Sequence, residues 1–342
     1  MKTLFKAMSV LCIFAVLLSI IIIPASAMTI YDGSFGYEID AFLRKAQLVS
    51  YTGQDSSVVI PDSFRGYPVT EITKSAFSGN TALEEVSIPS SVTKIENEAF
   101  RGCTSLQSMV IPETVTDLGR GVFTDCIMLS QVTIDAAISI LPADSFAGCT
   151  SLCEINLSNT ITTIGNAAFA KCTSIQDLSF LGNVNRIADS AFYGNGFTDI
   201  EIPIGISSIP YYAFAFSETL THVTIPKTVE YIHPNAFTGS QNVVIKCYYD
   251  TCGYEYAIEQ NIPYILLDNT ILGDASGDGS VNINDVTTIQ RYLAELETLE
   301  GIYLHAADAN QDGTVDIADA TIIQMYLAEY EMDYPIGEVM TQ

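Results

Sequence analysis

The sequence predicts a solenoid of short parallel β-strands followed by a small all-α unit. Three observations predict this architecture. A phenylalanine recurs at intervals of 23 residues, with one interval of 22, through the middle of the 342-residue chain. A 12-residue acidic motif occurs twice near the C-terminus, and the two copies begin 34 residues apart. Beyond residue 267, 15 acidic residues accompany a single basic one, Arg291, and this shift in composition indicates a domain boundary.

The composition excludes some partners. The chain has 40 acidic and 14 basic residues, which gives a formal net charge of −26. Nucleic acids and anionic membranes carry the same sign, so neither is expected as a partner. Hydrophobic residues make up 48% and charged residues 16% of the chain, which is typical of folded rather than disordered proteins.

The first 27 residues have the pattern of a secretory signal peptide. Lys2 and Lys6 precede an apolar run from Met8 to Ile23, and Ala25-Ser26-Ala27 fits a cleavage site. We therefore expect a secreted, extracellular protein with no membrane contact after cleavage. The alternative is an uncleaved anchor helix, for which the apolar run is short.

The 23-residue repeat predicts the body of the protein. An apolar pair follows each phenylalanine in most units, as Leu106 and Met109 follow Phe100. Alternation such as Val86-Ser87-Ile88 predicts a short strand, and one such strand cannot bury its apolar side alone. Stacked strands would build a continuous core with a ladder of phenylalanines inside it. The ladder positions are Phe77, Phe100, Phe123, Phe146, Phe169, Phe192, Phe214 and Phe237.

Units such as Ile88 to Cys103 resemble the BspA-like leucine-rich repeat family. The resemblance extends from Phe35 to about Leu267. It implies a leucine-rich-repeat solenoid of the α/β class over residues 28–267, with a distinct first unit beginning at Phe35. It also implies a C-terminal capping helix within 254–263, which would cover the open end of the sheet.

The outward face of the predicted strands carries acidic residues and no aromatic rings, which argues against sugar binding on that face. Glu154, Asp177 and Asp199 would stand one strand spacing apart, which resembles the carboxylate pair of a retaining glycosidase. A flat sheet face offers no pocket that would desolvate an acid, so a solvated acidic stripe is the favoured interpretation. Contact of this stripe with a basic partner is the weaker functional alternative.

Cysteine and histidine give no metal-site pattern. No CxxC spacing exists, which disfavours zinc, and no metal-type pair forms around the histidines, which we interpret as surface residues. Four cysteines share one slot after the phenylalanine, and we expect a ladder of buried thiols. Whether Cys247 and Cys252 form a disulfide is left open by the sequence. The ladder comprises Cys103, Cys126, Cys149 and Cys172, and the histidines are His222, His233 and His305.

The segments 274–285 and 308–319 are predicted to bind one calcium ion each. Both place oxygen-bearing side chains at positions 1, 3, 5, 9 and 12, glycine at position 6, and a residue at position 7 that offers its carbonyl. Position 12 is Asp instead of the usual Glu. Ser276 is a poorer ligand than Asn310, so we expect the first site to be weaker. The ligands are Asp274, Ser276, Asp278, Ser280, Asn282 and Asp285, then Asp308, Asn310, Asp312, Thr314, Asp316 and Asp319.

A helix is expected after each loop, over 286–295 and 320–330. This paired arrangement is similar to the type I dockerin family over residues 268–342. The resemblance implies calcium-dependent docking to a cohesin module of a scaffoldin in a cellulosome-like complex. The family's Ser-Thr pair at loop positions 10 and 11 is missing, so the identity of the cohesin stays open, as does a dual docking orientation. The cohesin contacts implied are Ile283, Asn284, Gln290, Arg291, Ile317, Ala318, Gln324 and Met325.

These features predict a secreted, non-catalytic binding protein. The dockerin would attach it to a cohesin on an extracellular complex associated with polysaccharide degradation, and the solenoid would present a surface to a protein or glycan ligand. A surface adhesin is the alternative that the repeat resemblance implies. A polysaccharide hydrolase is less favoured, because the repeats occupy residues 28–267 and leave no room for a catalytic domain.

Overall fold

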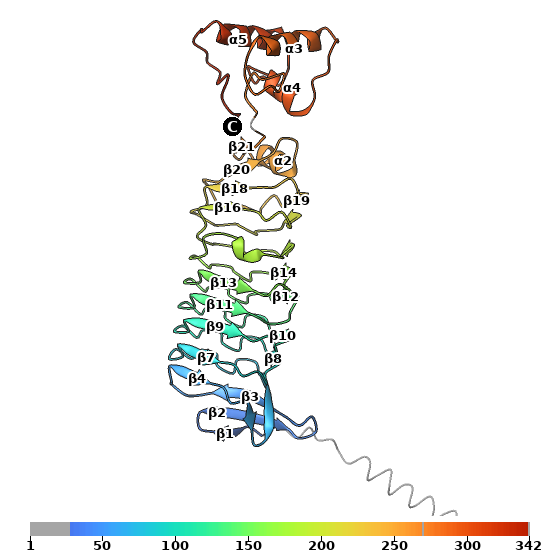
Figure 1. Cartoon of the computed structure of the whole chain (residues 1–342). Coiled ribbons are helices and arrows are strands. Elements are labelled where there is room, and N and C mark those ends of the chain that lie inside the picture. The colour runs from blue at the N-terminus through green and yellow to red at the C-terminus, as the bar shows by residue number, and fades with distance from the viewer. Residues whose placement is uncertain (1–27, 269, 341–342) are drawn as a thin grey trace, which may run out of the picture.

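The protein is a rod of stacked coils with a helical unit at one end (Figure 1). The computed structural model describes residues 28–268 and 270–340, so the predicted signal peptide lies outside the described residues. The N-terminal strands β1 and β2 form one end of the rod, and helices α3 and α5 form the other (Figure 1). This arrangement confirms the predicted solenoid and the predicted helical unit.

One side of the rod is built from short parallel strands in successive turns. In β9, β11 and β13 the inward residues Met109, Val132 and Ile155 are in register. A 3-10 helix, η1 (Ser179–Leu181), replaces the strand in the next turn, where Phe180 packs edge-on against Phe169. The strands are β4 (Ser57–Val59), β7 (Glu85–Ser87), β9 (Ser108–Ile111), β11 (Gln131–Ile134), β13 (Glu154–Leu157), β16 (Asp199–Glu201), β18 (His222–Thr224) and β20 (Val244–Cys247).

A second row of two-residue strands closes each coil on the opposite side. These strands also pair in parallel from turn to turn, and each buries an apolar residue such as Ile95 or Ile164. They are β8 (Lys94–Ile95), β10 (Asp117–Leu118), β12 (Ile140–Leu141), β14 (Thr163–Ile164), β15 (Arg186–Ile187), β17 (Ser208–Ile209) and β19 (Tyr231–Ile232).

Distinct units cover both ends of the solenoid. At the N-terminal end β1 and β2 pair antiparallel, and β2 pairs with β3. At the C-terminal end the predicted capping helix is α2 (Cys252–Glu259), followed by β21 (Tyr264–Leu266), which pairs with β20. The N-terminal strands are β1 (Ile30–Asp32), β2 (Phe35–Asp40), β3 (Lys45–Tyr51), β5 (Ser63–Phe64) and β6 (Tyr67–Ile72).

The predicted phenylalanine ladder forms the core. The rings of the eight phenylalanines stack in sequence, with centroid separations from 4.9 Å between Phe77 and Phe100 to 5.7 Å between Phe169 and Phe192. All eight are buried. Tyr51 extends the stack at one end, and Tyr256 of α2 closes it at the other. The cap therefore shields the last ring as well as the sheet edge.

The predicted thiol ladder is also present. Cys103, Cys126, Cys149 and Cys172 are fully buried, and each thiol donates to the carbonyl of the phenylalanine 26 residues earlier, as Cys149 does to Phe123 at 3.1 Å. Burial raises the pKa of the Cys103 thiol to about 12. Cys247 and Cys252 are separate thiols, and Cys153 is exposed.

These surroundings predict selective labelling of the native protein. A thiol must ionise to attack an electrophile, and the ladder thiols are both buried and held protonated. We expect iodoacetamide at mildly alkaline pH to modify Cys153 first, while Cys126 and Cys149 react only after unfolding. Mass spectrometry of peptides from a short labelling pulse measures this order, and Cys153→Ser should remove the fast reaction. Equal rates at Cys149 and Cys153 would contradict the buried ladder.

Two positions in each turn have left-handed backbone, except in the turn of Phe237, which has only the second. The first falls two residues before the ladder phenylalanine, and the second two residues after it. Left-handed backbone disfavours bulky side chains, and glycine accommodates it best. The first series is Ser75, Glu98, Gly121, Asp144, Ala167, Ser190 and Tyr212, and the second is Gly79, Gly102, Asp125, Gly148, Lys171, Gly194, Phe216 and Gly239.

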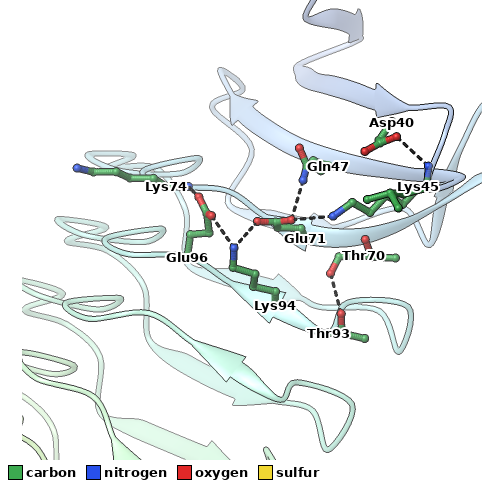
Figure 2. A network of polar contacts seen from close by, with 10 residues as sticks. Asp40, Lys45, Gln47, Thr70, Glu71, Lys74, Thr93, Lys94 and Glu96 are labelled. Carbon is green, nitrogen blue, oxygen red and sulfur yellow. Dashed lines mark hydrogen bonds and ion pairs between the residues drawn. The ribbon is translucent and has the colours of Figure 1, made fainter. Parts of the chain in front are cut away.

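An ion-pair network joins the N-terminal unit to the first repeats (Figure 2). Glu71 is only 6% exposed and accepts from Lys94 at 2.8 Å, from Gln47 at 2.7 Å and from Lys45 at 3.4 Å. Lys94 also pairs with Glu96 at 2.8 Å. Burial would raise the pKa of Glu71, but Lys94, Glu96 and Gln47 together hold it below its ordinary value. The network thus favours the ionised carboxylate in the folded state.

A lowered pKa makes the folded state depend on pH in a defined direction. The contribution of Glu71 is present above its unfolded value near 4.5 and is lost as the pH falls below that value. We expect Glu71→Gln to lower the free energy of unfolding by about 1–2 kcal/mol at neutral pH, since Lys94 remains partly solvated. Urea unfolding at pH 7 and pH 3.5 measures this difference. It should shrink at the lower pH, and a difference that grows there would contradict the network.

Candidate functional site

The two predicted loops are joined to their helices by shared side chains. Asn282, at loop position 9, is the N-cap of α3 (Ile283–Leu293), and its side chain accepts from the backbone N–H of Asn284 at 2.8 Å. Asp285, at position 12, accepts in return from the N–H of Asn282 at 2.7 Å. This reciprocal capping box begins the helix at position 10 of the loop, three residues earlier than predicted.

The second loop repeats this arrangement. Asp316 caps α5 (Ile317–Leu327) and accepts from the N–H of Ala318 at 2.6 Å, while Asp319 accepts from the N–H of Asp316 at 2.8 Å. The predicted start at residue 320 was wrong for the same reason. A short helix that the sequence did not reveal, α4 (Gly301–Ala307), precedes this loop.

The first residue of each loop organises the turn around it. The carboxylate of Asp274 accepts from the N–H of Gly277, Asp278 and Gly279, and that of Asp308 accepts from Asp312 and Gly313. The position-6 glycines, Gly279 and Gly313, have φ of +86° and +89°. Left-handed backbone there makes the sharp turn that a calcium loop needs.

The donor set fits a hard cation. The side chains of each loop offer oxygen as carboxylate, hydroxyl or amide, and no imidazole or thiol takes part. Asp274, Asp285, Asp308 and Asp319 are at most 7% exposed although they are acidic. Across residues 28–268 and 270–340, no group of three His, Cys, Asp or Glu side chains forms a metal cluster by itself. The neutral oxygens of the loops must therefore complete any coordination.

Buried carboxylates need a positive partner. Burial raises the pKa of Asp285 and of Asp319, and the neighbouring carboxylates Asp274 and Asp308 act in the same direction. Each loop thus holds one carboxylate, Asp285 or Asp319, whose charged form burial disfavours, and a cation would offset that cost. Calcium held by these residues would supply that charge and join the loop to the first turn of its helix.

All eight predicted cohesin contacts are exposed and lie on α3 and α5. Ile283 and Ile317, each 61% exposed, begin α3 and α5, which pack against each other. Both helices lie at the tip of the rod, with α4 between them and the solenoid (Figure 1). Asn284, Gln290, Arg291, Ala318, Gln324 and Met325 complete the predicted set.

The same face carries apolar residues that the sequence analysis missed. Leu293 and Leu327 are 39% and 38% exposed, and Leu296 and Tyr330 are 71% and 63% exposed. The members of each pair are 34 residues apart, which is the spacing of the two loops. The sequence signal that could have identified them is this spacing, because it places an apolar residue at the same position after each loop.

The helical unit contacts the cap of the solenoid. The ring of His305 in α4 stacks on Tyr249 with centroids 5.4 Å apart, and its Nε2 is buried without a hydrogen-bond partner. Desolvation lowers the pKa of His305. The prediction of a surface histidine was therefore wrong here. Asp268 accepts from the N–H of Tyr249 at 2.6 Å, which fixes the connection between the two parts.

Two acidic residues of the strand face, Asp177 and Asp199, have separate polar partners. Asp177 lies before η1 and accepts from the N–H of Ser179 at 2.8 Å, a bond that lowers its pKa. Asp199 is exposed and pairs with His222 at 2.8 Å. A general acid needs a raised pKa, and the surroundings of Asp177 have the opposite effect.

Family comparisons identify both parts of the chain. The family described as "BspA type Leucine rich repeat region" matches residues 70–195 and 185–252 with six copies. The chain belongs to this family. "Dockerin type I domain" matches residues 272–328, which contain both loops with α3, α4 and α5 up to Leu327. Leucine-rich repeats and dockerins, the two modules of this BspA type protein, are both non-catalytic types of module. Type I dockerin domains bind calcium.

Solved structures resemble the BspA type solenoid. A leucine rich cell surface protein of Faecalibacterium prausnitzii is 22% identical, covering 65% of this chain and 89% of its own, with a TM-score of 0.36. The T. pallidum leucine rich repeat protein is 22% identical over 64% and 86%, with a TM-score of 0.37. A leucine-rich repeat protein of Eubacterium ventriosum is 24% identical over 59% and 49%, with a TM-score of 0.42. No curated protein matches the chain.

The described residues also contain no helix with the length and apolar character needed to cross a bilayer.

Proposed function

We propose that the protein is a secreted, non-catalytic binding protein whose dockerin docks to a cohesin on an extracellular scaffold. Two calcium ions, one in each loop, would order the docking helices. The solenoid would then display a recognition surface beside enzymes that degrade polysaccharide. The observation that carries this proposal is the exposed, twice-repeated face of α3 and α5 at the tip of the rod.

The exposed apolar residues of this face and its position support docking. Ile283 and Ile317 are apolar, exposed and directly attached to the two loops. Apolar anchors that are solvated in the free protein and buried on association dominate most interfaces. The two helices lie at the end of the rod farthest from the N-terminal strands, so a cohesin bound to them would leave the rod accessible (Figure 1).

The repeated face also predicts how docking responds to substitution. We expect the double variant Ile283→Asp/Ile317→Asp to lose at least about 30-fold in affinity for type I cohesins, since each change removes a central apolar anchor. Titration calorimetry with recombinant cohesins in the presence of calcium measures this. If each single variant keeps nearly full affinity, docking has two orientations, and if one single variant abolishes it, docking has one.

Ile258→Asp provides the control, because Ile258 is 53% exposed on the cap helix α2 and lies outside the docking face. This variant should bind cohesin as the natural chain does. Wild-type affinity of the folded double variant would show that α3 and α5 are not the docking face.

A further inference from the structure

A cluster of aromatic rings lies on the surface of the solenoid, away from the strand face. We call Tyr193, Tyr211, Tyr212 and Phe216 the aromatic patch. Tyr193 comes from one turn and the other three come from the next. The rings of Tyr211 and Tyr212 stack at 3.9 Å, Phe216 lies 5.2 Å from Tyr193, and Tyr212 lies 6.1 Å from Phe216.

The fold does not require these rings. Tyr212 and Phe216 occupy the two left-handed positions of their turn, with φ of 55° and 56°. The position of Phe216 is glycine in five other turns, and that of Tyr212 is serine in two. Bulky residues in left-handed backbone are strained, and such strain concentrates at functional sites.

Burial does not offset this strain. Phe216 is 43% exposed and Tyr211 is 38% exposed, while Tyr193 and Tyr212 are half-buried. Large rings that stay in water contribute little to the core, so their placement indicates a surface that binds something.

A polar hollow adjoins the patch. It has a volume of about 310 Å³ and is lined by Glu218, Gly239, Gln241 and Asn242. The Phe216 ring lies against Gly239, where an added Cβ would be 2.7 Å from Phe216 Cδ1. The patch and the hollow therefore meet at Gly239, and glycine there leaves room for the ring.

This combination fits a sugar chain. A pyranose ring has an apolar C–H face, which packs on aromatic rings, and a rim of hydroxyls, which pair with amides and carboxylates. Glu218 places a carboxylate in the hollow, and the negative charge of Asp189 lies near enough to Tyr211 to disfavour ionisation of its hydroxyl. Both charges would repel an anionic chain.

We propose that the aromatic patch and the adjoining hollow bind a neutral polysaccharide, with pyranose rings on Tyr212 and Phe216 and their hydroxyls paired with Gln241, Asn242 and Glu218. This proposal names the class of ligand that the solenoid surface would bind. It rests on the proposed function only in that the docked dockerin would present this surface outside the cell. Cohesin docking involves other residues and can be measured separately.

The repeats themselves provide the test variants. Phe216→Gly and Tyr212→Ser restore residues that the same positions carry in other turns, so both should fold, with a thermal midpoint equal to or above that of the natural chain. Native affinity electrophoresis with mixed-linkage β-glucan, arabinoxylan or glucomannan in the gel measures binding. We expect the full chain to be retarded by at least one of the three, and each variant to lose at least tenfold in affinity for it.

Tyr31→Ser is the matched control, because Tyr31 is 61% exposed at the opposite end of the solenoid. It should be retarded like the natural chain. The proposal is wrong if none of the three polysaccharides retards the natural chain, in which case the patch would suit a protein partner, or if the folded variants are retarded equally. Cohesin affinity, measured in parallel, should be unchanged in Phe216→Gly, so loss of docking and loss of sugar binding are distinguishable.

Discussion

Removal of calcium from the full chain is expected to unfold the dockerin and leave the solenoid intact. Four nearly buried aspartates, Asp274, Asp285, Asp308 and Asp319, lie in the two loops, and burial disfavours the charged form of Asp285 and Asp319. The dockerin core cannot replace the energy of calcium binding, because many of its buried apolar residues are alanines, such as Ala306 and Ala320. With free calcium about 100-fold above the dissociation constant, each site would contribute about 2.7 kcal/mol to stability.

Hydrogen exchange with mass spectrometry resolves the two parts of the chain. In the presence of EDTA we expect residues 283–293 and 317–327 to lose their protection, while the turns around Phe146 keep theirs. Asp319→Asn should reproduce part of the loss with calcium present, since Asp319 belongs to both the loop and the helix cap. Equal protection of α3 and α5 with and without EDTA would show that the loops do not order these helices.

The second large effect is expected at the centre of the phenylalanine ladder. Phe146 is fully buried and stacks on Phe123 and Phe169, each at 5.4 Å. We expect Phe146→Ala to lower the free energy of unfolding of the solenoid by about 3–5 kcal/mol, because it removes a ring and leaves a cavity that neighbouring turns cannot fill. Urea unfolding followed by circular dichroism measures the change.

Phe42→Ala is the control for this loss. Phe42 is 93% exposed in the turn between β2 and β3, so its replacement should change stability by less than about 0.5 kcal/mol. In a repeat protein each turn contacts mainly its neighbours. The cost of Phe146→Ala should therefore appear as early opening of the central turns, and a loss below about 1 kcal/mol would exclude a continuous stack.

Periodicity predicted the parts of this molecule that depend on repetition. The 23-residue spacing located the phenylalanine and thiol ladders, because identical neighbours meet when identical turns stack. The loop motif predicted two matching turns, each with a left-handed glycine at position 6, and the role of their oxygens as calcium ligands stays a prediction.

Contacts between unlike residues were not predictable in this way. The helix starts were predicted three residues late, because the loop residues Asn282 and Asp316 are also the helix N-caps, and Asp285 and Asp319 complete the capping boxes. His305 is half-buried against Tyr249, which lies far upstream in the chain, and no local pattern indicates that contact. The aromatic patch combines residues from two turns at positions that are polar or small elsewhere, so a consensus of the repeat conceals it.

The near-constant spacing of the stacked rings has a consequence for the length of the protein. Every turn advances the rod by about the same increment, between 4.9 and 5.7 Å from ring to ring. Duplication or deletion of one unit in the gene would lengthen or shorten the rod by one such step without altering either end. The distance between the helical unit and the N-terminal strands is therefore adjustable in evolution in steps of one turn, while the residues of both ends stay unchanged.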